Sequence, residues 1–165
     1  MSQYRVTRAQ MRQLSRGVRR AGRAVQRLKS SHTDLPLSIV PHTVCDLQIT
    51  GRPAEPQPRP RLMGRRVVSV PSGSPIALWK ARVKAEARLA MGPRPPTLEP
   101  VEVLMVFGLV EARGDLDNYI IGTLNALTGI VYQDDRQVRK LAAEIIPVNL
   151  EPCTIITVRV PGTRP

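Results

Sequence analysis

The amino-acid sequence predicts an α+β fold in which helices pack on a mixed β-sheet, preceded by a basic helical arm. Three observations support this. Strand-like runs are mixed with two helix-like segments, without a regular βαβα alternation. Apolar residues make up 42% of the chain and aromatic residues only 3%, so the core must be mainly aliphatic. The first 33 residues contain no Asp or Glu, and nine of the 25 Lys and Arg residues precede position 30.

Residues 1–43 are predicted to be the basic helical arm and its linker. Apolar residues recur there at spacings of three and four, which is typical of one helix face: Met11, Leu14, Val18, Ala21, Val25 and Leu28. This face can dock on the rest of the protein, and a short coiled-coil dimer is an alternative. We also expect the arm to contact phosphates, because nine cations without a nearby acid repel one another unless an anion is present.

Residues 44–165 are predicted to form the folded domain. Alternation of apolar and polar residues over 44–49 indicates a strand, and a proline-rich loop follows over 52–61. A short strand is expected over 67–70. Ser74-Pro75 begins a helix that Gly92-Pro93 ends. Its buried stripe is expected to be Ile76, Trp79, Val83, Ala87 and Ala90.

The second half of this domain is predicted to contain three strands and one helix. The nearly continuous apolar run over 101–110 indicates a strand at the centre of its sheet. A helix over 118–127 follows and ends at Thr128-Gly129. Strands are expected over 137–146 and 153–160, although Leu141-Ala-Ala-Glu is ambiguous between strand and helix.

The charge of the chain indicates a polyanionic partner. Lys and Arg total 25 against 13 Asp and Glu, which gives a net charge of +12 and a pI near 11.1. DNA, RNA and an anionic membrane are the candidates. No apolar run approaches the roughly 18 residues that span a bilayer, and no signal peptide is visible, so we expect no membrane partner.

Cysteine and histidine chemistry is not expected. Cys45 and Cys153 lack metal-ligand spacing and lie in strand-like runs, so both are interpreted as reduced core residues of a cytoplasmic protein. A disulfide between them is the alternative. His32 and His42 lie in the arm and linker, which argues against a Ser-His-Asp triad. The sequence also lacks a Walker-type loop and an HExxH motif.

Carboxylates are the candidate catalytic groups because they are scarce and clustered. Four of the six Asp residues lie between 115 and 135: Asp115, Asp117, Asp134 and Asp135. Residues two apart in an extended segment point the same way, so the first pair should converge beyond the central strand. We expect Asp135 to return there after the helix. Oxygen clusters of this kind bind Mg²⁺ or Mn²⁺, and such a metal can assist phosphodiester cleavage. The alternative is that Asp117 caps the helix and Asp134-Asp135 is a solvated turn.

At these residues the chain resembles the RusA family of Holliday junction resolvases. That family has Asp-x-Asp-Asn at a strand end, a helix ending Leu-x-Gly, and then Asp-Asp-x-Gln-Val. The corresponding segments are Asp115-Leu-Asp117-Asn118, Leu127-Thr-Gly129 and Asp134-Asp135-Arg-Gln-Val138. Further similarity lies in Ile49-Thr-Gly-Arg-Pro53, Pro58-Arg-Pro-Arg61 and Trp79-Lys80. The resemblance covers roughly residues 44–160.

The resemblance implies a homodimeric, Mg²⁺-dependent endonuclease that makes paired nicks across a four-way DNA junction. It also implies a phage or prophage setting, and thus a bacterial or phage-infected cytoplasm. By matching positions, Asp115, Asp117 and Asp135 are the essential carboxylates, with Asp134 as a further candidate metal ligand. The candidate DNA contacts are the arm together with Arg59, Arg61, Arg65, Arg66, Arg113, Arg139 and Lys140.

Two departures from the family pattern leave an alternative open. Ile121 occupies the position of the family's Lys, and Asn125 that of an Asp. Positions 117, 121 and 125 share one helix face, so the absent Lys would lie near the carboxylates unless Arg139 or Lys140 replaces it. The chain can therefore be a slow nuclease or only a binder of branched DNA. A structural RNA-binding protein is the third hypothesis, but it gives the clustered Asp residues no role.

Overall fold

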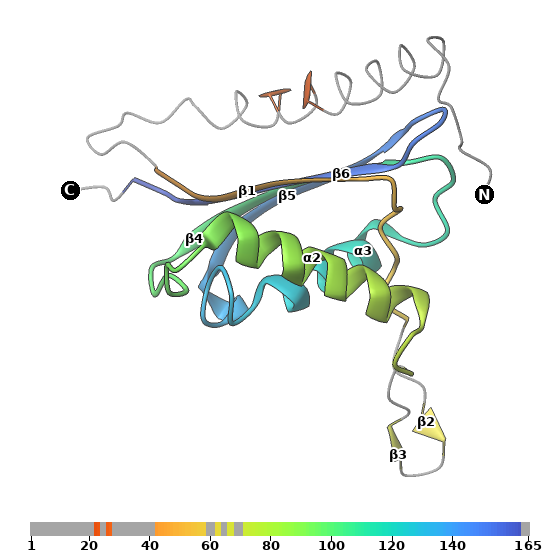
Figure 1. Cartoon of the computed structure of the whole chain (residues 1–165), viewed down its shortest axis with the longest axis horizontal. Helices are drawn as coiled ribbons and strands as arrows, with labels where there is room; N and C mark the ends of the chain where they lie inside the picture. The colour runs from red at the N-terminus through yellow and green to blue at the C-terminus, as the bar shows by residue number, and fades with distance from the viewer. Residues whose placement is uncertain are drawn as a thin grey trace, which may run out of the picture.

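The computed structural model describes residues 22–23, 26–27, 42–58, 62–63, 66–67 and 71–162. A four-stranded mixed sheet carries two helices on one face (Figure 1). The sheet strands are β1 (His42–Thr50), β4 (Val101–Leu109), β5 (Val138–Pro147) and β6 (Cys153–Val160). The helices are α2 (Pro75–Met91) and α3 (Leu116–Leu127), and a 3-10 turn, η1 (Asp135–Gln137), leads into β5. The predicted α+β class is confirmed.

The order of the strands in the sheet is β1-β6-β4-β5. β6 is antiparallel to both β1 and β4, whereas β4 and β5 are parallel. Parallel neighbours need a crossover connection, and here α3 carries the chain from the end of β4 back to the start of β5. The predicted central position of the 101–110 strand is therefore confirmed, and β5 lies at one edge of the described sheet.

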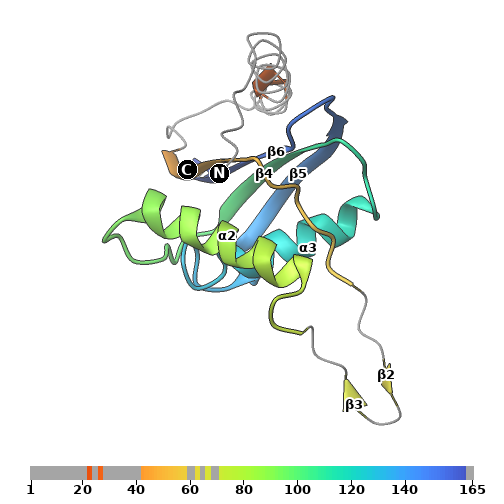
Figure 2. The same cartoon turned by 45° about the vertical axis from the view of Figure 1, so that its right-hand side comes forward.

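Each helix covers a different half of the sheet (Figure 2). α2 contacts β1 and α3, whereas α3 contacts β5. α3 therefore packs on the β5 side of the sheet. In the described part of the chain, no helix is long and apolar enough to cross a membrane.

The residues that the sequence predicts at the two ends of α2 begin and end the helix in the structure. The Ser74 side chain accepts a hydrogen bond from the amide of Ala77 at 3.4 Å, and Pro75 begins the helix. Gly92 ends it with a φ of 55°, a value that side chains with a Cβ rarely adopt. The predicted buried stripe needs one correction, because Met91 is buried and Ala90 is exposed. Both positions follow Ala87 by about one turn, and the packing of the helix on the sheet selects between them.

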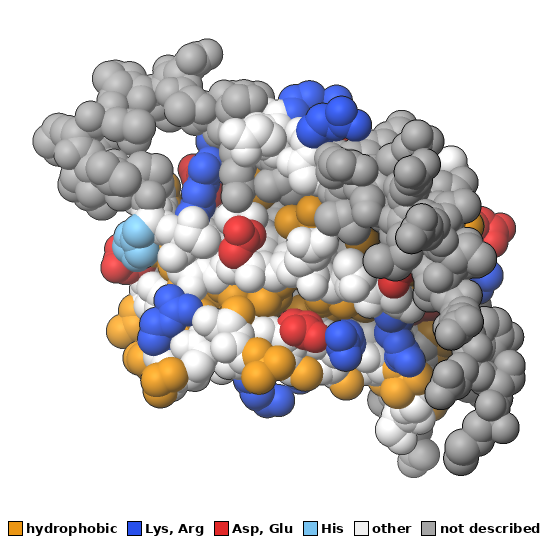
Figure 3. All heavy atoms as spheres, turned by 45° about the horizontal axis from the view of Figure 1, so that its top comes forward, with side chains coloured by type: hydrophobic (Ala, Val, Ile, Leu, Met, Phe, Trp, Pro, Cys, Tyr) orange, Lys and Arg blue, Asp and Glu red, His pale blue; other side chains and the backbone are white. Residues whose placement is uncertain are grey.

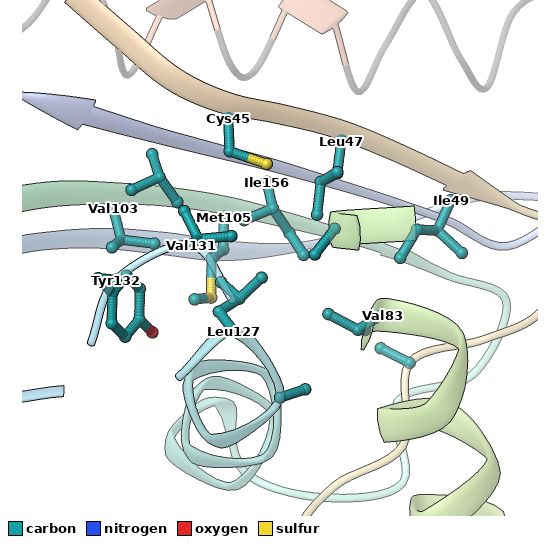
Figure 4. Close-up of a cluster of buried hydrophobic side chains, with 14 of the residues drawn as sticks. Cys45, Leu47, Ile49, Val83, Val103, Met105, Leu127, Val131, Tyr132 and Ile156 are labelled. Carbon is teal, nitrogen blue, oxygen red and sulfur yellow. The ribbon is translucent and has the colours of Figure 1, made fainter. Parts of the chain in front are cut away.

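The core between the sheet and the helices is mainly aliphatic, as the low aromatic content predicts (Figure 4). Cys45, Leu47 and Ile49 point from β1 toward the side chains of β4, α2 and the segment after α3. Both cysteines are buried and free, so the reduced state is confirmed and the disulfide alternative is not adopted. Burial raises the pKa of Cys45 to about 11, which keeps the thiol protonated at neutral pH.

A close contact between β4 and β6 requires a glycine. A Cβ at Gly108 would lie 2.7 Å from the Cys153 Sγ and 3.0 Å from the Cys153 carbonyl oxygen. Gly108 is paired with Cys153 in the antiparallel register, so this contact belongs to the sheet itself. The glycine therefore allows the bulky thiol to pack against the central strand.

Two sequence expectations fall largely beyond the described part of the structure, and one ambiguity is resolved by it. Of the strand predicted over 67–70, only Val67 is described; it is the last residue of β3 (Arg66–Val67), which pairs with β2 (Leu62–Met63) in a two-stranded ribbon, and residues 68–70 lie outside the described residues. The ambiguous Leu141-Ala-Ala-Glu segment is strand, inside β5. Most of the predicted arm also lies outside the described residues. Residues 22–23 and 26–27 are helical, and the Arg27 guanidinium pairs with the Glu144 carboxylate of β5 at 2.7 Å.

Candidate active site

Asp115 and Asp117 lie at the N-terminus of α3, beyond the end of β4. Asp115 is the N-cap residue with extended backbone angles, although its side chain makes no capping hydrogen bond. Asp117 is in the first helical turn, where its carboxylate accepts a hydrogen bond from the Asn118 amide at 2.9 Å. Both side chains are exposed. The helix begins at Leu116 and not at 118, so the expected extended Asp-x-Asp segment is wrong, while Leu116 packs toward the core as predicted.

The segment that follows β1 fixes the start of α3. The Gln57 amide donates to the Asn118 carbonyl oxygen at 2.9 Å, and a Cβ at Gly114 would lie 3.0 Å from the Pro56 side chain. In addition, the buried Tyr119 hydroxyl accepts a hydrogen bond from the Arg113 amide at 2.9 Å. The loop that carries Asp115 is therefore held by the segment after β1 and by Tyr119.

A hollow of about 210 Å³ lies beside this loop. Its polar lining residues include Glu55, Glu111 and Arg113, and Tyr119 forms part of its apolar wall. The Arg113 guanidinium lies 3.6 Å from the Glu111 carboxylate, and both side chains are exposed. Arg113, a predicted DNA contact, is thus close in space to the Asp115 loop. Glu55 was not among the predicted site residues, because a single sequence contains no signal that residues so far apart in the chain are neighbours.

Asp134 and Asp135 lie immediately before β5, where Asp134 has a structural role. Asp134 caps η1, and its carboxylate accepts hydrogen bonds from the Arg136 amide at 2.9 Å and from the Arg136 guanidinium at 3.0 Å. These bonds lower the pKa of Asp134 to about 2. The Gln137 side chain completes the cap by accepting a bond from the Asp134 amide at 2.8 Å. Asp135 is exposed beside this cap.

The topology separates the two groups of carboxylates. In the parallel register, Val101 pairs with Val138 and Leu109 pairs with Pro147. Asp135 therefore lies at the end of the sheet where β4 begins. At this end the Gln137 side-chain amide donates hydrogen bonds to the carbonyl oxygens of Thr97 and Glu99. Asp115 and Asp117 follow the opposite end of β4. The 12 residues of α3 lie between the two groups, and at 1.5 Å per residue such a helix spans about 18 Å.

The predicted convergence of Asp115, Asp117 and Asp135 within one chain is consequently wrong. Among the described residues, no group of three or more His, Cys, Asp or Glu side chains is placed to hold a metal ion. The physical reason is the parallel pairing of β4 with β5, because the crossover must return the chain to the end where β4 began. The assignment of these Asp residues as active-site residues remains a prediction.

The other predicted DNA contacts fall in three places. Lys140 lies on β5 and pairs with Glu102 at 3.6 Å, while Arg139 is exposed beside it. Glu102 also binds Arg159 at 2.8 Å, so Lys140 belongs to an ion-pair network. Arg66 lies in β3, but its side chain is not among those described; Arg59, Arg61 and Arg65 fall outside the described residues. On the face that Figure 3 shows, Lys and Arg side chains are interspersed with Asp and Glu.

Ile121 lies on the exposed surface of α3, one turn beyond Asp117. Its exposed fraction is 46%, and Asp117 and Asn125 on the same face are exposed as well. The exposure of Ile121 therefore excludes the explanation that an apolar residue stands here because it belongs to the core. A lysine at this position would lie on the same exposed helix face as Asp117, one turn away.

The fold and the exposed carboxylates define a basic α+β protein suited to acting on a nucleic acid. Residues 52–159 match the family model described as Endodeoxyribonuclease RusA. This match covers more than half of the chain and includes Asp115, Asp117 and Asp135, so the chain belongs to the RusA family of endodeoxyribonucleases. The family comprises hydrolases that act on DNA and includes Holliday junction resolvases. A search of curated proteins finds no match.

Proposed function

We propose that this protein is a structure-specific endonuclease that resolves four-way DNA junctions by paired nicks. The observation that carries the proposal is the family match over residues 52–159, which contains both acidic motifs. Asp115, Asp117 and Asp135 are the proposed essential residues, with Mg²⁺ as the cofactor and Mn²⁺ as a substitute. The proposed working form is a homodimer in a bacterial or phage-infected cytoplasm.

The carboxylates of one chain do not fit a three-ligand metal site, because Asp135 is at the other end of α3. A single chain therefore does not bring all three carboxylates to one metal ion. The chemistry of the donor set still supports a hard cation, since carboxylates near a phosphodiester repel it unless a cation is present. Asp134 is left out of the proposed ligands, because Arg136 already occupies its carboxylate.

Binding of the junction is proposed to depend on basic residues on several parts of the chain. Arg113 lies in the loop that carries Asp115, and Arg139 lies near the start of β5. Together with the basic arm and the arginines between 59 and 66, they supply cations for the phosphates on the arms of a junction. Lys140 contributes less in this proposal, because Glu102 already neutralises part of its charge.

A binder of branched DNA with weak or absent cleavage is the second candidate function. Ile121 favours it, because an exposed apolar residue stands at the position where the family has a lysine. The structural RNA-binding hypothesis is abandoned, because the chain belongs to a family of DNA endonucleases.

Cleavage of a synthetic four-way junction, with and without Mg²⁺, tests the proposal. We expect metal-dependent paired nicks in the junction and none in a linear duplex of the same sequence. Asp117→Asn should abolish cleavage while junction affinity is kept, and Glu99→Gln is the control for loss of an exposed acid elsewhere. Cleavage that survives in Asp117→Asn contradicts the assigned site. Tight binding without cleavage, in either Mg²⁺ or Mn²⁺, replaces the nuclease with the binder.

A further inference from the structure

The face of the sheet that points away from α2 and α3, called here the second face, leads to an inference about the N-terminal arm. We propose that residues 11–28 form an amphipathic helix that docks on the second face as a third layer and presents a row of arginines to the phosphate backbone of duplex DNA. The docking is independent of the proposed function. The role of the arginines rests on that function, because it assumes that the protein acts on DNA.

The buried state of Leu104 indicates that the second face is covered. In β4 the core residues Val103 and Met105 point toward the helices, so Leu104 and Val106 point to the second face. Their exposed fractions are nevertheless only 1% and 0%. Val106 belongs to a small cluster of its own, but Leu104 belongs to neither cluster of the described residues. A further part of the chain must therefore cover Leu104.

The arm is the segment that is placed to provide this cover. Residues 22–23 and 26–27, red in Figures 1 and 2, lie on the side of the sheet opposite α2 and α3. The Arg27 guanidinium donates to the Glu144 carboxylate at 2.7 Å, and Glu144 pairs with Val106, so it belongs to the second face. Apart from the first 41 residues, each segment outside the described part has three residues or fewer. Only the arm is therefore long enough to cover the sheet.

The second oxygen of the Glu144 carboxylate also indicates a covered surface. Glu144 Oε1 is buried and has no hydrogen-bond partner among the described residues, although the side chain points away from the two helices. The arm contains nine Lys and Arg residues and no acid, so its charge is complementary to this carboxylate. A helix over residues 11–28 is about 27 Å long, and the nine residues of β4 span about 30 Å, so the lengths match.

The exposure of the described arm residues identifies the side of the helix that docks. Four of them are exposed and lie on one side of a helix, at relative positions 0, 1, 4 and 5: Gly22, Arg23, Gln26 and Arg27. The apolar stripe predicted from the sequence, which includes positions 21, 25 and 28, falls on the other side. Docking through the stripe therefore agrees with the observed exposure, with Arg27 at the edge of the contact.

The outer side of the docked helix is basic. Four arginines follow one another at spacings of four, three and four, on the side that includes the exposed Arg23: Arg12, Arg16, Arg19 and Arg23. Docking of the stripe leaves this row in solvent and fixes its direction relative to the sheet. A row of guanidinium groups without acids binds the phosphate backbone of DNA and does not read its bases.

Hydrogen exchange compares an added acid on the two sides of the same helical turn. In the wild type we expect the amides of residues 15–28 to exchange more slowly than in a free chain. Val25→Asp places a charge against the second face and should accelerate their exchange at least about tenfold, because it removes an apolar side chain from the contact. Gln26→Asp adds the same charge on the exposed side and should change little.

Three outcomes of this experiment overturn the docking. They are unprotected arm amides in the wild type, equal acceleration by Val25→Asp and Gln26→Asp, and protection that is lost on dilution. The last outcome indicates a coiled coil between two chains in place of a contact with the sheet.

A double-substitution cycle tests where the helix docks. Arg27→Gln and Glu144→Gln should each accelerate exchange of the arm amides about two- to fivefold, since each removes the same exposed ion pair. The double variant should then be no faster than either single variant. Additive effects, or no effect of Glu144→Gln, place the helix away from Glu144 and overturn docking on the second face.

Affinity for a linear DNA duplex, measured without metal across a salt series, tests the arginine row. Arg16→Gln/Arg23→Gln should weaken binding and reduce the salt slope by about two, or one for each phosphate contact. Arg82→Gln/Arg88→Gln removes the same charge from the exposed side of α2 and should keep the slope. An equal slope in the two double variants overturns the role of the row. A protein that binds DNA through the row but cuts no four-way junction refutes the proposed nuclease and leaves this inference intact.

Discussion

Two threonines on β6 differ in whether the hydroxyl has a partner. The Thr157 hydroxyl donates to the Asp46 carboxylate at 2.6 Å, whereas the buried Thr154 hydroxyl has no partner among the described residues. Valine has nearly the same shape as threonine. We expect Thr157→Val to lower the free energy of unfolding by about 1–2 kcal/mol through loss of this bond.

Thr154→Val is the matched control on the same strand. It removes an unpaired buried hydroxyl, so its unfolding free energy should equal or exceed that of the wild type. Urea denaturation of both variants measures the difference. Equal destabilisation by the two substitutions would contradict the importance of the Thr157–Asp46 bond.

The two buried thiols should be unreactive in the folded protein. Burial raises the pKa of Cys45 to about 11 and also raises that of Cys153. Only the thiolate reacts with Ellman's reagent, so we expect very slow labelling at pH 8 and labelling of both thiols after unfolding in urea. Because the pKa of Cys45 is higher in the folded protein than in the unfolded chain, the neutral thiol contributes fully to stability at any pH below the pKa of the unfolded chain. That contribution is lost as the pH rises toward 11. Rapid labelling of the native protein would contradict this account.

Ile121 is the residue at which the catalytic rate is expected to respond to a single charge. A lysine there would lie one turn beyond Asp117, where it can stabilise negative charge that develops on the phosphate. We expect Ile121→Lys to increase the single-turnover cleavage rate, by up to about 10²-fold, with little change in junction affinity. Ala85→Lys adds the same charge on the exposed side of α2 and should leave the rate unchanged. An unchanged or lower rate in Ile121→Lys would mean that another cation already acts there.

Among the elements, the short turn η1 joins two parts of the sheet that are far apart in the sequence. The Gln137 side chain accepts a hydrogen bond from the Asp134 amide at 2.8 Å. It donates hydrogen bonds to the carbonyl oxygens of Thr97 and Glu99 at 2.9 Å each. It therefore fixes the segment before β4 against the start of β5. The same contacts hold the position of Asp135, which precedes Gln137 in the turn.

Gln137→Ala tests this connection. The substitution leaves two carbonyl oxygens and one amide without their partner, so we expect a loss of about 1–3 kcal/mol in the free energy of unfolding. Gln133→Ala removes a side chain of the same type from an exposed position four residues earlier, and it should cost little. A Gln137→Ala protein as stable as the control would show that water replaces these bonds without loss.

For the whole molecule, the net charge of +12 has a direct consequence for DNA binding. Each phosphate that a Lys or Arg neutralises releases a counterion, so affinity must decrease steeply with salt. If the chain makes six to ten phosphate contacts, junction affinity should fall about 10³–10⁵-fold between 50 and 200 mM salt. Replacing Arg8, Arg12, Arg16 and Arg19 of the arm with Gln should reduce the slope. A flat dependence would mean that the basic residues do not contact phosphate.

Local features of the fold followed from the sequence alone. The Ser74-Pro75 start and the Gly92 end of α2, the alternation along β1 and the buried state of both cysteines depend on residues that are close together in the chain. Secondary structure is set largely by such short-range preferences, and the continuous apolar run over 101–110 correctly indicated a central strand. The acidic motifs that point to the family are equally local.

The relative positions of those motifs were decided only by the tertiary structure. The spacing of Asp115, Asp117 and Asp135 does not reveal that β4 and β5 are parallel, and an antiparallel pair would have allowed a different return path. Parallel pairing forces α3 to cross back to the start of the sheet, and this crossing separates the carboxylates by the length of the helix. Strand pairing is a long-range choice that depends on packing of the whole core, so a single sequence does not specify where the predicted active-site residues lie relative to one another.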